Sequence, residues 1–249
     1  MSVWYAIPSA RPPEEAAKVL NLWLERGYKI ALRRDQNDWP YVGALVSYGA
    51  YRGYPAEVNA LCRMILQVDP EAEWIVTGGD DVEPDPNKSA DEIAVECEAE
   101  FYERHAREFR WINGERDPEK VRTFGVMQPT GDPFAGNCIT RICGSPWMGR
   151  EFCRRMYGGR GPFCEEYRHM FPDEELQEIA IKLGVFWQRP DLTHYHHHFT
   201  RIGNDAVYDA RRPVPSFLKE ANSPEHWKTF QNLFFQRKAT GFPGHEPIP

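Results

Sequence analysis

Short apolar runs alternate with longer amphipathic segments through the first half of the chain. Residues 3–7, 28–32, 42–48, 73–77 and 123–127 have the length and apolar content of buried strands. The spacing of apolar residues predicts helices over 13–27, 56–68 and 89–109. Strands that alternate with helices in this order build a parallel sheet with helices on its faces, so the pattern predicts an α/β fold.

The second half of the chain has a looser pattern. We expect helices over 147–157, 172–183 and 226–237, a short strand over 185–188 and an extended segment over 193–200. Beyond about residue 203 the chain is polar and interrupted by prolines. We therefore expect residues 1–202 to form one domain and residues 203–249 to form a C-terminal extension that packs on it.

One stretch combines a buried strand with candidate chemistry. The predicted strand 73–77 is followed by Gly78 and Gly79, and then by Asp80 and Asp81. The glycines allow a sharp turn, and ligands of open α/β sheets bind at the carboxyl ends of the strands. Paired carboxylates at that position suit Mg²⁺ or Mn²⁺ bound to a phosphate group. An acidic turn rich in glycine and proline is the alternative.

Histidines near residue 195 are the other candidate ligands. His194, His196 and His198 alternate along an extended segment and would share one face. A ring nitrogen on this face could complete a metal site. A solvent-facing histidine cluster, or an aromatic patch with Tyr195 and Phe199, is the alternative.

Two further residues have both a functional and a structural interpretation. Asp173 opens a predicted helix, where an acidic side chain favours the positive helix end. The same position could direct a general base into a cleft. Trp147 could stack on a sugar ring, or it could belong to the core.

Composition narrows the classes of function. The 249 residues carry a net charge of −7, which does not support a strongly basic nucleic-acid binder. Six cysteines without a C-x-x-C pair indicate reduced thiols, and the first residues lack a signal peptide pattern, so we expect a cytoplasmic protein without a membrane span. The chain has no G-x-G-x-x-G, Walker A or G-x-S-x-G motif, which disfavours dehydrogenases, P-loop enzymes and α/β-hydrolases.

Four segments resemble, in order, those of GT-A glycosyltransferases, especially the family 2-like inverting enzymes and related bacteriophage proteins. They are the proline-containing loop 7–11, the helix that follows Gly53 and Tyr54 and carries Asn59, the acidic strand end 79–84, and the segment 171–176. The resemblance covers roughly residues 3–200. It implies a Rossmann-like GT-A fold, with a mixed, mostly parallel sheet flanked by helices, and makes residues 1–202 the nucleotide-sugar-binding and catalytic domain.

The resemblance also implies roles for individual residues. Asp81 resembles the metal-binding acid of the D-x-D region, and His196 or His198 would complete the Mn²⁺ or Mg²⁺ site. Asp173 would be the catalytic base. The donor, expected to be a UDP-sugar, would be bound by Pro8, Ser9, Arg11, Asp35, Gly53, Tyr54, Asn59, Gly79, Asp80 and Trp147.

The sequence departs from the family pattern at two positions. Gly79 stands where a strict D-x-D motif has its first acid, which leaves Asp81 and a histidine as the expected metal ligands. Phe171 and Pro172 replace the usual acidic neighbour of Asp173, the expected base.

The implied reaction is transfer of a sugar from a nucleotide-sugar donor to an acceptor hydroxyl, with inversion by a single displacement. A nucleotidyltransferase is the alternative enzyme, although residues 8–13 make a poor phosphate loop. A non-catalytic carbohydrate-binding protein on the same scaffold is the other alternative.

The acceptor stays open between a polysaccharide, a glycolipid, a protein and a hydroxymethylated base of DNA. The resemblance to bacteriophage proteins suggests DNA as one acceptor. Binding of DNA would need a local basic face. The acidic net charge of the chain argues against such a face. The candidate residues for such a face are Arg154, Arg155, Arg160, Arg211 and Arg212.

Overall fold

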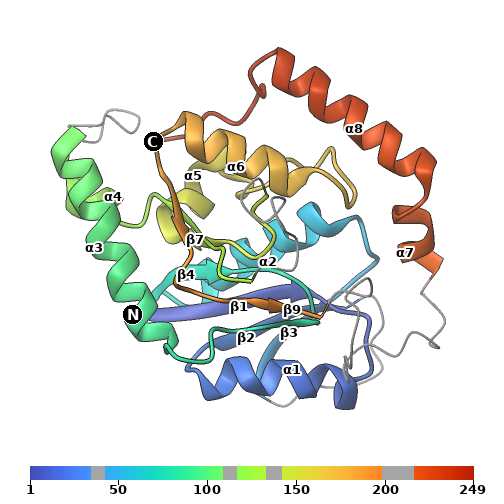
Figure 1. The fold of residues 1–249 in the computed structure, drawn as a ribbon, viewed down its shortest axis with the longest axis horizontal. Helices are drawn as coiled ribbons and strands as arrows, with labels where there is room; N and C mark the ends of the chain where they lie inside the picture. The colour runs from blue at the N-terminus through green and yellow to red at the C-terminus, as the bar shows by residue number, and fades with distance from the viewer. Residues whose placement is uncertain (35–42, 109–116, 133–141, 198–215) are drawn as a thin grey trace.

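A seven-stranded sheet forms the centre of the molecule (Figure 1). The computed structural model describes residues 1–34, 43–108, 117–132, 142–197 and 216–249. The sheet contains β3 (Ala44–Tyr48), β2 (Lys29–Arg34), β1 (Ser2–Pro8), β4 (Ala72–Val76), β7 (Trp147–Gly149), β6 (Val126–Pro129) and β8 (Phe186–Arg189), in that spatial order. Of these seven strands, β7 alone runs against its neighbours. The predicted α/β class, with a mixed and mostly parallel sheet flanked by helices, is confirmed.

Helices cover both faces of the sheet (Figure 1). They are α1 (Pro13–Glu25), α2 (Tyr54–Val68), α3 (Ala90–Glu108), α4 (Pro118–Val121), α5 (Arg150–Gly159), α6 (Pro172–Lys182), α7 (Ser216–Ala221) and α8 (Pro224–Ala239). In Figure 1, α1 lies on one side of the sheet, and α2, α5 and α6 lie on the other. Within the described ranges, none of the helices combines the length and apolarity that a membrane crossing requires.

The apolar run of β1 reflects its position between two parallel neighbours, β2 and β4. Residues 3–7 are all buried, on both faces of the strand. Trp23 of α1 stacks on Tyr5 with ring centroids 3.7 Å apart, and Tyr28 meets the edge of Trp23 at 4.6 Å. A strand covered on both faces has no solvent side, so its sequence is continuously apolar rather than alternating.

Two predicted elements differ in the structure. The helix expected over 147–157 begins at Arg150, because Trp147 pairs with both β4 and β6 as part of β7. The extended segment expected over 193–200 contains only a two-residue strand within its described part, β9 (Tyr195–His196). It pairs with β5 (Val82–Glu83) in a separate sheet. Strands of two or three residues carry too little periodicity for recognition from sequence.

A buried ion pair attaches the C-terminal helix α8 to α6. Arg237 donates two hydrogen bonds to Glu175, at 2.9 and 2.8 Å, and the two side chains are 7% and 1% exposed. The hydroxyls of Tyr157 and Tyr167 donate to the same carboxylate at 2.6 and 2.7 Å. These four hydrogen bonds compensate the loss of water around Glu175.

Replacing Arg237 with methionine should lower the free energy of unfolding by about 3–5 kcal/mol, because Glu175 would keep a buried charge without its partner. Lys238→Met is the matched control. Lys238 also joins α8 to α6, 2.6 Å from Glu178, but these side chains are 45% and 42% exposed. Loss of this exposed pair should cost about 0–1 kcal/mol. Urea unfolding measures both values, and equal losses would contradict the role given to Glu175.

Candidate functional site

The candidate site lies where the carboxyl ends of β1 and β4 meet. The hydroxyl of Tyr5 in β1 donates to the carbonyl of Gly79 at 2.6 Å. The hydroxyl of Thr77, just after β4, donates to a carbonyl of β1 at 2.8 Å. These two bonds hold the turn that carries Asp80 and Asp81 against the end of β1.

The two glycines of this turn leave room for the functional side chains beside them. A Cβ atom at Gly79 would lie 2.3 Å from Oδ1 of Asp81, and one at Gly78 would lie 2.9 Å from the hydroxyl of Tyr5. A larger residue at Gly79 would displace the Asp81 carboxylate, and one at Gly78 would press on the Tyr5 hydroxyl that holds the turn. Gly79, which stands where a strict D-x-D motif has its first acid, therefore preserves the orientation of Asp81.

Asp80 binds the loop that follows β1. It accepts hydrogen bonds from Oγ of Ser9 and from Nε of Arg11, each at 2.6 Å. Burial raises the pKa of Asp80, and the positive charge of Arg11 opposes this shift. Three of the residues predicted to bind the donor thus form one hydrogen-bonded group, next to Pro8 at the end of β1.

Asp81 and His196 come together although they lie far apart in the sequence. The pairing of β5 with β9 places His196 opposite Val82, and Nε2 of His196 is 3.4 Å from Oδ1 of Asp81. Burial alone would raise the pKa of Asp81, but its interactions with His196 and Arg11 lower it. The neighbouring His197 has a different partner, because its Nε2 lies 2.6 Å from Glu83.

Asp81 and His196 are two side chains at this site that could hold a metal ion. Within the described part of the chain, no group of three or more His, Cys, Asp and Glu residues is arranged to hold a metal. The predicted ligand His198 and the predicted donor contact Asp35 lie outside the described residues. Two protein donors nevertheless suit a metal that is also bound by substrate phosphates and water.

Asp173 lies in the first turn of α6, close to Tyr54 at the start of α2. The hydroxyls of Tyr54 and Thr77 are 3.0 Å apart, which connects α2 to the end of β4. Burial raises the pKa of Tyr54, and the negative charge of Asp173 also raises it. Gly53 is required here, because a Cβ atom would lie 2.8 Å from the carbonyl oxygen of Arg168. The same carbonyl accepts a hydrogen bond from the backbone N–H of Tyr54 at 2.7 Å.

His169 belongs to the same region and was not predicted. Its Nδ1 atom is buried and has no hydrogen-bond partner among the described residues. Burial lowers the pKa of His169, and the charge of Asp173 opposes this shift. No sequence pattern indicates a role for His169. It precedes Asp173 by the length of one helical turn, but the segment between them is not helical, so this spacing does not predict that the two side chains meet.

Asn59 is a structural residue, which corrects its prediction as a donor contact. Its amide group donates to the carbonyl of Phe163 at 2.8 Å and accepts from the Phe163 backbone at 3.1 Å. A Cβ atom at Gly161 would lie 2.6 Å from the same amide. Asn59 therefore clamps the loop after α5 onto α2.

Trp147 and His194 are core residues, which corrects two further expectations. Trp147 is 0% exposed and packs edge-on against Tyr28, so it presents no face to a sugar. His194 is 4% exposed, and its Nδ1 is 2.8 Å from Oγ of Ser145. It therefore does not share an open ligand face with His196.

Of the three described candidates for a basic face, two are already paired with an acid, whereas Arg160 is exposed and donates to the carbonyl of Tyr157. Arg154 and Arg155 both pair with Glu151, at 2.8 and 2.7 Å, and Arg155 is buried. Arg211 and Arg212 lie outside the described residues. Charges that are already paired contribute little to phosphate binding.

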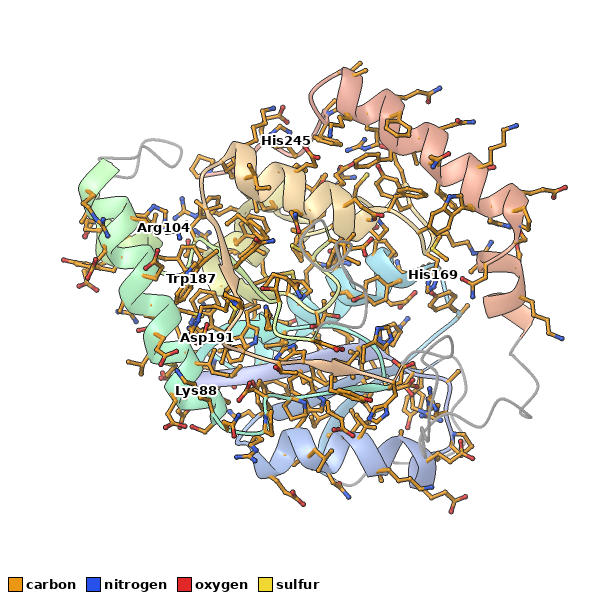
Figure 2. The ribbon with its side chains drawn as sticks, viewed as in Figure 1. Lys88, Arg104, His169, Trp187, Asp191 and His245 are labelled. Atoms are coloured by element: carbon orange, nitrogen blue, oxygen red, sulfur yellow. The ribbon has the colours of Figure 1, made fainter. Side chains whose placement is uncertain are left out.

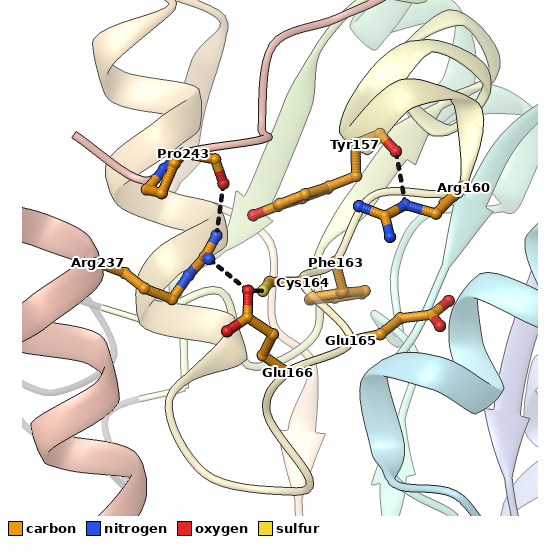
Figure 3. Close-up of a pocket in the computed structure, with 8 residues that line it drawn as sticks. All are labelled: Tyr157, Arg160, Phe163, Cys164, Glu165, Glu166, Arg237 and Pro243. Atoms are coloured by element: carbon orange, nitrogen blue, oxygen red, sulfur yellow. Dashed lines mark hydrogen bonds and ion pairs between the residues drawn. The ribbon is translucent and has the colours of Figure 1, made fainter. Parts of the chain in front are cut away.

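Figure 3 shows a pocket of about 220 Å³ beside α5 and α8. Its lining residues are Tyr157, Arg160, Phe163, Cys164, Glu165, Glu166, Arg237 and Pro243, and of these only Arg160, a candidate for the basic face, was given a functional role from the sequence. Several of its polar groups bind one another: Arg237 donates to Glu166 at 2.8 Å, and Arg160 donates to the Tyr157 carbonyl at 3.0 Å. The candidate site is therefore distinct from this pocket.

No protein-family model matches the chain, and no curated protein matches its sequence. Among solved structures, it is similar to the crystal structure of the catalytic domain of Drosophila beta1,4galactosyltransferase 7 in complex with xylobiose. The two share 12% identity with a TM-score of 0.43, over 90% of this chain and 81% of the other. A similarity of this size assigns no residue and no activity to this chain.

The buried His194 should make the fold sensitive to mild acid. Burial lowers its pKa to about 4 in the folded chain, against about 6.5 in an unfolded chain. The unfolded chain therefore binds the proton first, so the stability linked to His194 is complete above about pH 6.5 and is lost as the pH falls towards about 4.

The variant His194→Gln does not titrate at this position. Between about pH 7 and pH 4, the wild type should lose about 3 kcal/mol more unfolding free energy than the variant. Urea unfolding across this pH range measures the difference, and parallel pH profiles would show that His194 is not the group responsible.

Proposed function

We propose that this chain is a metal-dependent glycosyltransferase that moves a sugar from a nucleotide-sugar donor to an acceptor hydroxyl, with inversion. The observation that carries the proposal is the approach of His196 to Asp81, at 3.4 Å, at the end of a central parallel strand. A carboxylate and an imidazole brought together from distant segments are ligand types that divalent transition metals accept. The carboxyl edge of such a sheet is where nucleotides bind.

The residues present fit a divalent metal. Asp81 offers a hard carboxylate oxygen and His196 an imidazole nitrogen, a mixture that Mn²⁺ accepts. Both side chains are partly exposed, at 19% and 42%, so a bound diphosphate has access to them. When bound, the metal would neutralise charge on the leaving diphosphate.

The donor half of the site is proposed to use the group formed by Ser9, Arg11 and Asp80. Asp80 would contact the ribose or the sugar, with its orientation maintained by the hydrogen bonds from Ser9 and Arg11. Arg11 carries a positive charge next to both acids, 3.7 Å from Asp81, and so is placed to face a phosphate group as well. A UDP-sugar is the donor proposed for this half.

The acceptor half is proposed to use Asp173 as the general base. Its side chain is partly exposed and lies near Tyr54, which contacts the end of β4. Asp173 would accept the proton of an acceptor hydroxyl as the oxygen attacks the anomeric carbon. The bond between that carbon and the diphosphate breaks in the same step, and a single displacement inverts the configuration.

The variant His196→Ala should lose the increase in melting temperature that Mn²⁺ produces together with a UDP-sugar, because it lacks one of the two proposed ligands. Asp81→Asn should behave in the same way. His197→Ala is the matched control, because the neighbouring histidine pairs with Glu83 instead. Thermal melting with Mn²⁺ alone, a UDP-, GDP- or TDP-sugar alone, and both together measures the effect. An unchanged response in His196→Ala would exclude this metal site, and no response of the wild type to any nucleotide sugar would reject the proposed donor.

The variant Asp173→Asn should reduce the rate of sugar transfer by about 10²–10⁴-fold, because the amide cannot accept the acceptor proton. Its melting temperature with donor and Mn²⁺ should stay that of the wild type. Glu174→Gln, at the next position of the same helix turn, is the control. Product analysis separates sugar transfer from nucleotidyl transfer. A transfer rate within about twofold of the wild type would show that Asp173 is not the base.

A further inference from the structure

Arg11 is a cationic side chain that faces both acids of the turn after β4. Its Nε donates to Oδ1 of Asp80 at 2.6 Å, and its Nη2 lies 3.7 Å from Oδ2 of Asp81. The three side chains are partly buried, with 20%, 16% and 19% of their surface exposed. The other oxygen of Asp81 lies 3.4 Å from Nε2 of His196, the second proposed metal ligand. A metal ion bound to Asp81 would therefore share this carboxylate with the guanidinium of Arg11.

The backbone around Arg11 keeps the guanidinium at this position. The N–H of Arg11 donates to Oγ of Ser9 at 3.3 Å, and its carbonyl accepts a hydrogen bond from Nη1 of the buried Arg34 at 2.9 Å. Helix α1 begins two residues later, and Figure 2 shows side chains filling the space between α1 and the sheet. Arg11 is thus placed beside the acids by the fold, and not by its ion pairs alone.

The charges of the site disfavour a metal that binds alone. A divalent ion about 2 Å from the Asp81 oxygen would stand within about 6 Å of the Arg11 guanidinium, where like charges repel in a partly buried site. A diphosphate that binds with the metal brings negative charge, and its oxygens accept hydrogen bonds from a guanidinium. Because the guanidinium has five N–H donors, different nitrogens can bind Asp80 and a phosphate.

From these contacts, we propose that Arg11 couples metal binding to the donor: its guanidinium opposes a divalent metal at Asp81 until a diphosphate binds with it. The inference rests on the proposed function, in which Asp81 and His196 bind the metal and Arg11 faces a phosphate. The metal and the diphosphate then bind together, and each strengthens the binding of the other by the same factor. A divalent metal without a nucleotide binds this site only weakly.

Equilibrium dialysis of the full-length protein against Mn²⁺ measures the coupling. The metal is tested alone, with UDP, GDP, TDP or inorganic pyrophosphate, and with uridine, which has no phosphate. For the wild type, the diphosphate that binds best should tighten Mn²⁺ binding by about 10–100-fold, and uridine should not change it. In Arg11→Gln, Mn²⁺ alone should bind about tenfold more tightly than in the wild type, because the opposing charge is gone. The diphosphate should then add less.

Two variants separate the charge of Arg11 from its packing. Arg11→Lys keeps the positive charge, so its binding of Mn²⁺ alone should stay within about twofold of the wild type. Arg52→Gln removes an arginine that follows β3 at the same edge of the sheet but pairs with Glu57 at 3.1 Å, and it should also leave Mn²⁺ binding unchanged. Melting temperatures identify any variant that fails to fold, and Arg11→Met replaces Arg11→Gln in that case.

The outcomes distinguish this inference from the proposed function. Equal binding of Mn²⁺ alone by the wild type and Arg11→Gln, or weaker binding by the variant, would overturn the inference and leave the proposed metal site standing. Weaker binding is the result expected if Arg11 only holds the turn in place. No binding of Mn²⁺ by the wild type or any Arg11 variant, with or without a diphosphate, would reject the metal site and with it the proposed function.

A combined variant locates the bound metal. Arg11→Gln together with His196→Ala should lose the tightened binding of Mn²⁺ alone, because one of the two proposed ligands is missing. Tightened binding that persists in the combined variant would overturn the inference, because the metal would then bind without His196.

Discussion

The parallel pairing of β1 with β4 is the constraint on which the candidate site depends. Because these strands run side by side at the centre of the sheet, the loop after β1 and the acidic turn after β4 emerge at the same edge. Two hydroxyls then fix the turn across the strand pair: Tyr5 donates to Gly79, and Thr77 donates to the carbonyl of Ala6. A shift of β1 by one residue relative to β4 would turn the Tyr5 hydroxyl to the opposite face of the sheet and remove its bond to the turn.

From this edge, the site extends in two directions. On one side, the acidic turn continues into β5, and β9 pairs with it, so a late segment of the chain delivers His196 to Asp81. On the other side, the hydrogen bond between Thr77 and Tyr54 connects the strand end to α2, and Tyr54 is close enough to Asp173 for their charges to interact. The group proposed to bind metal is thus held at this strand end by direct contacts, and the group proposed to transfer the proton is related to the same strand end through Tyr54.

Local patterns in the sequence predicted the long elements, because strands such as β1 and helices such as α2 carry their periodicity within one segment. The short strands β5 and β9 exist only through their mutual pairing, which no local pattern encodes. The approach of His196 to Asp81 was predicted from the resemblance to GT-A glycosyltransferases, in which a late histidine joins the metal-binding acid, and not from spacing. Motif resemblance misplaced Asn59 and Trp147, because a motif gives no information on burial: one clamps a loop and the other fills the core.

The cluster around Glu175 connects fold stability to the acceptor half of the site. A carboxylate that is 1% exposed is costly to bury, and an apolar residue of similar size would fill the space without that cost. What the carboxylate adds is direction, because Arg237 reaches it from α8 in a bidentate geometry that fixes one helix against the other. Helix α8 also packs Phe234 on Phe171, which has a left-handed backbone conformation and lies two residues before Asp173. The buried ion pair is therefore best understood as a positioning device, which holds α8 where Phe171 requires it and so maintains the entry of α6 into the site.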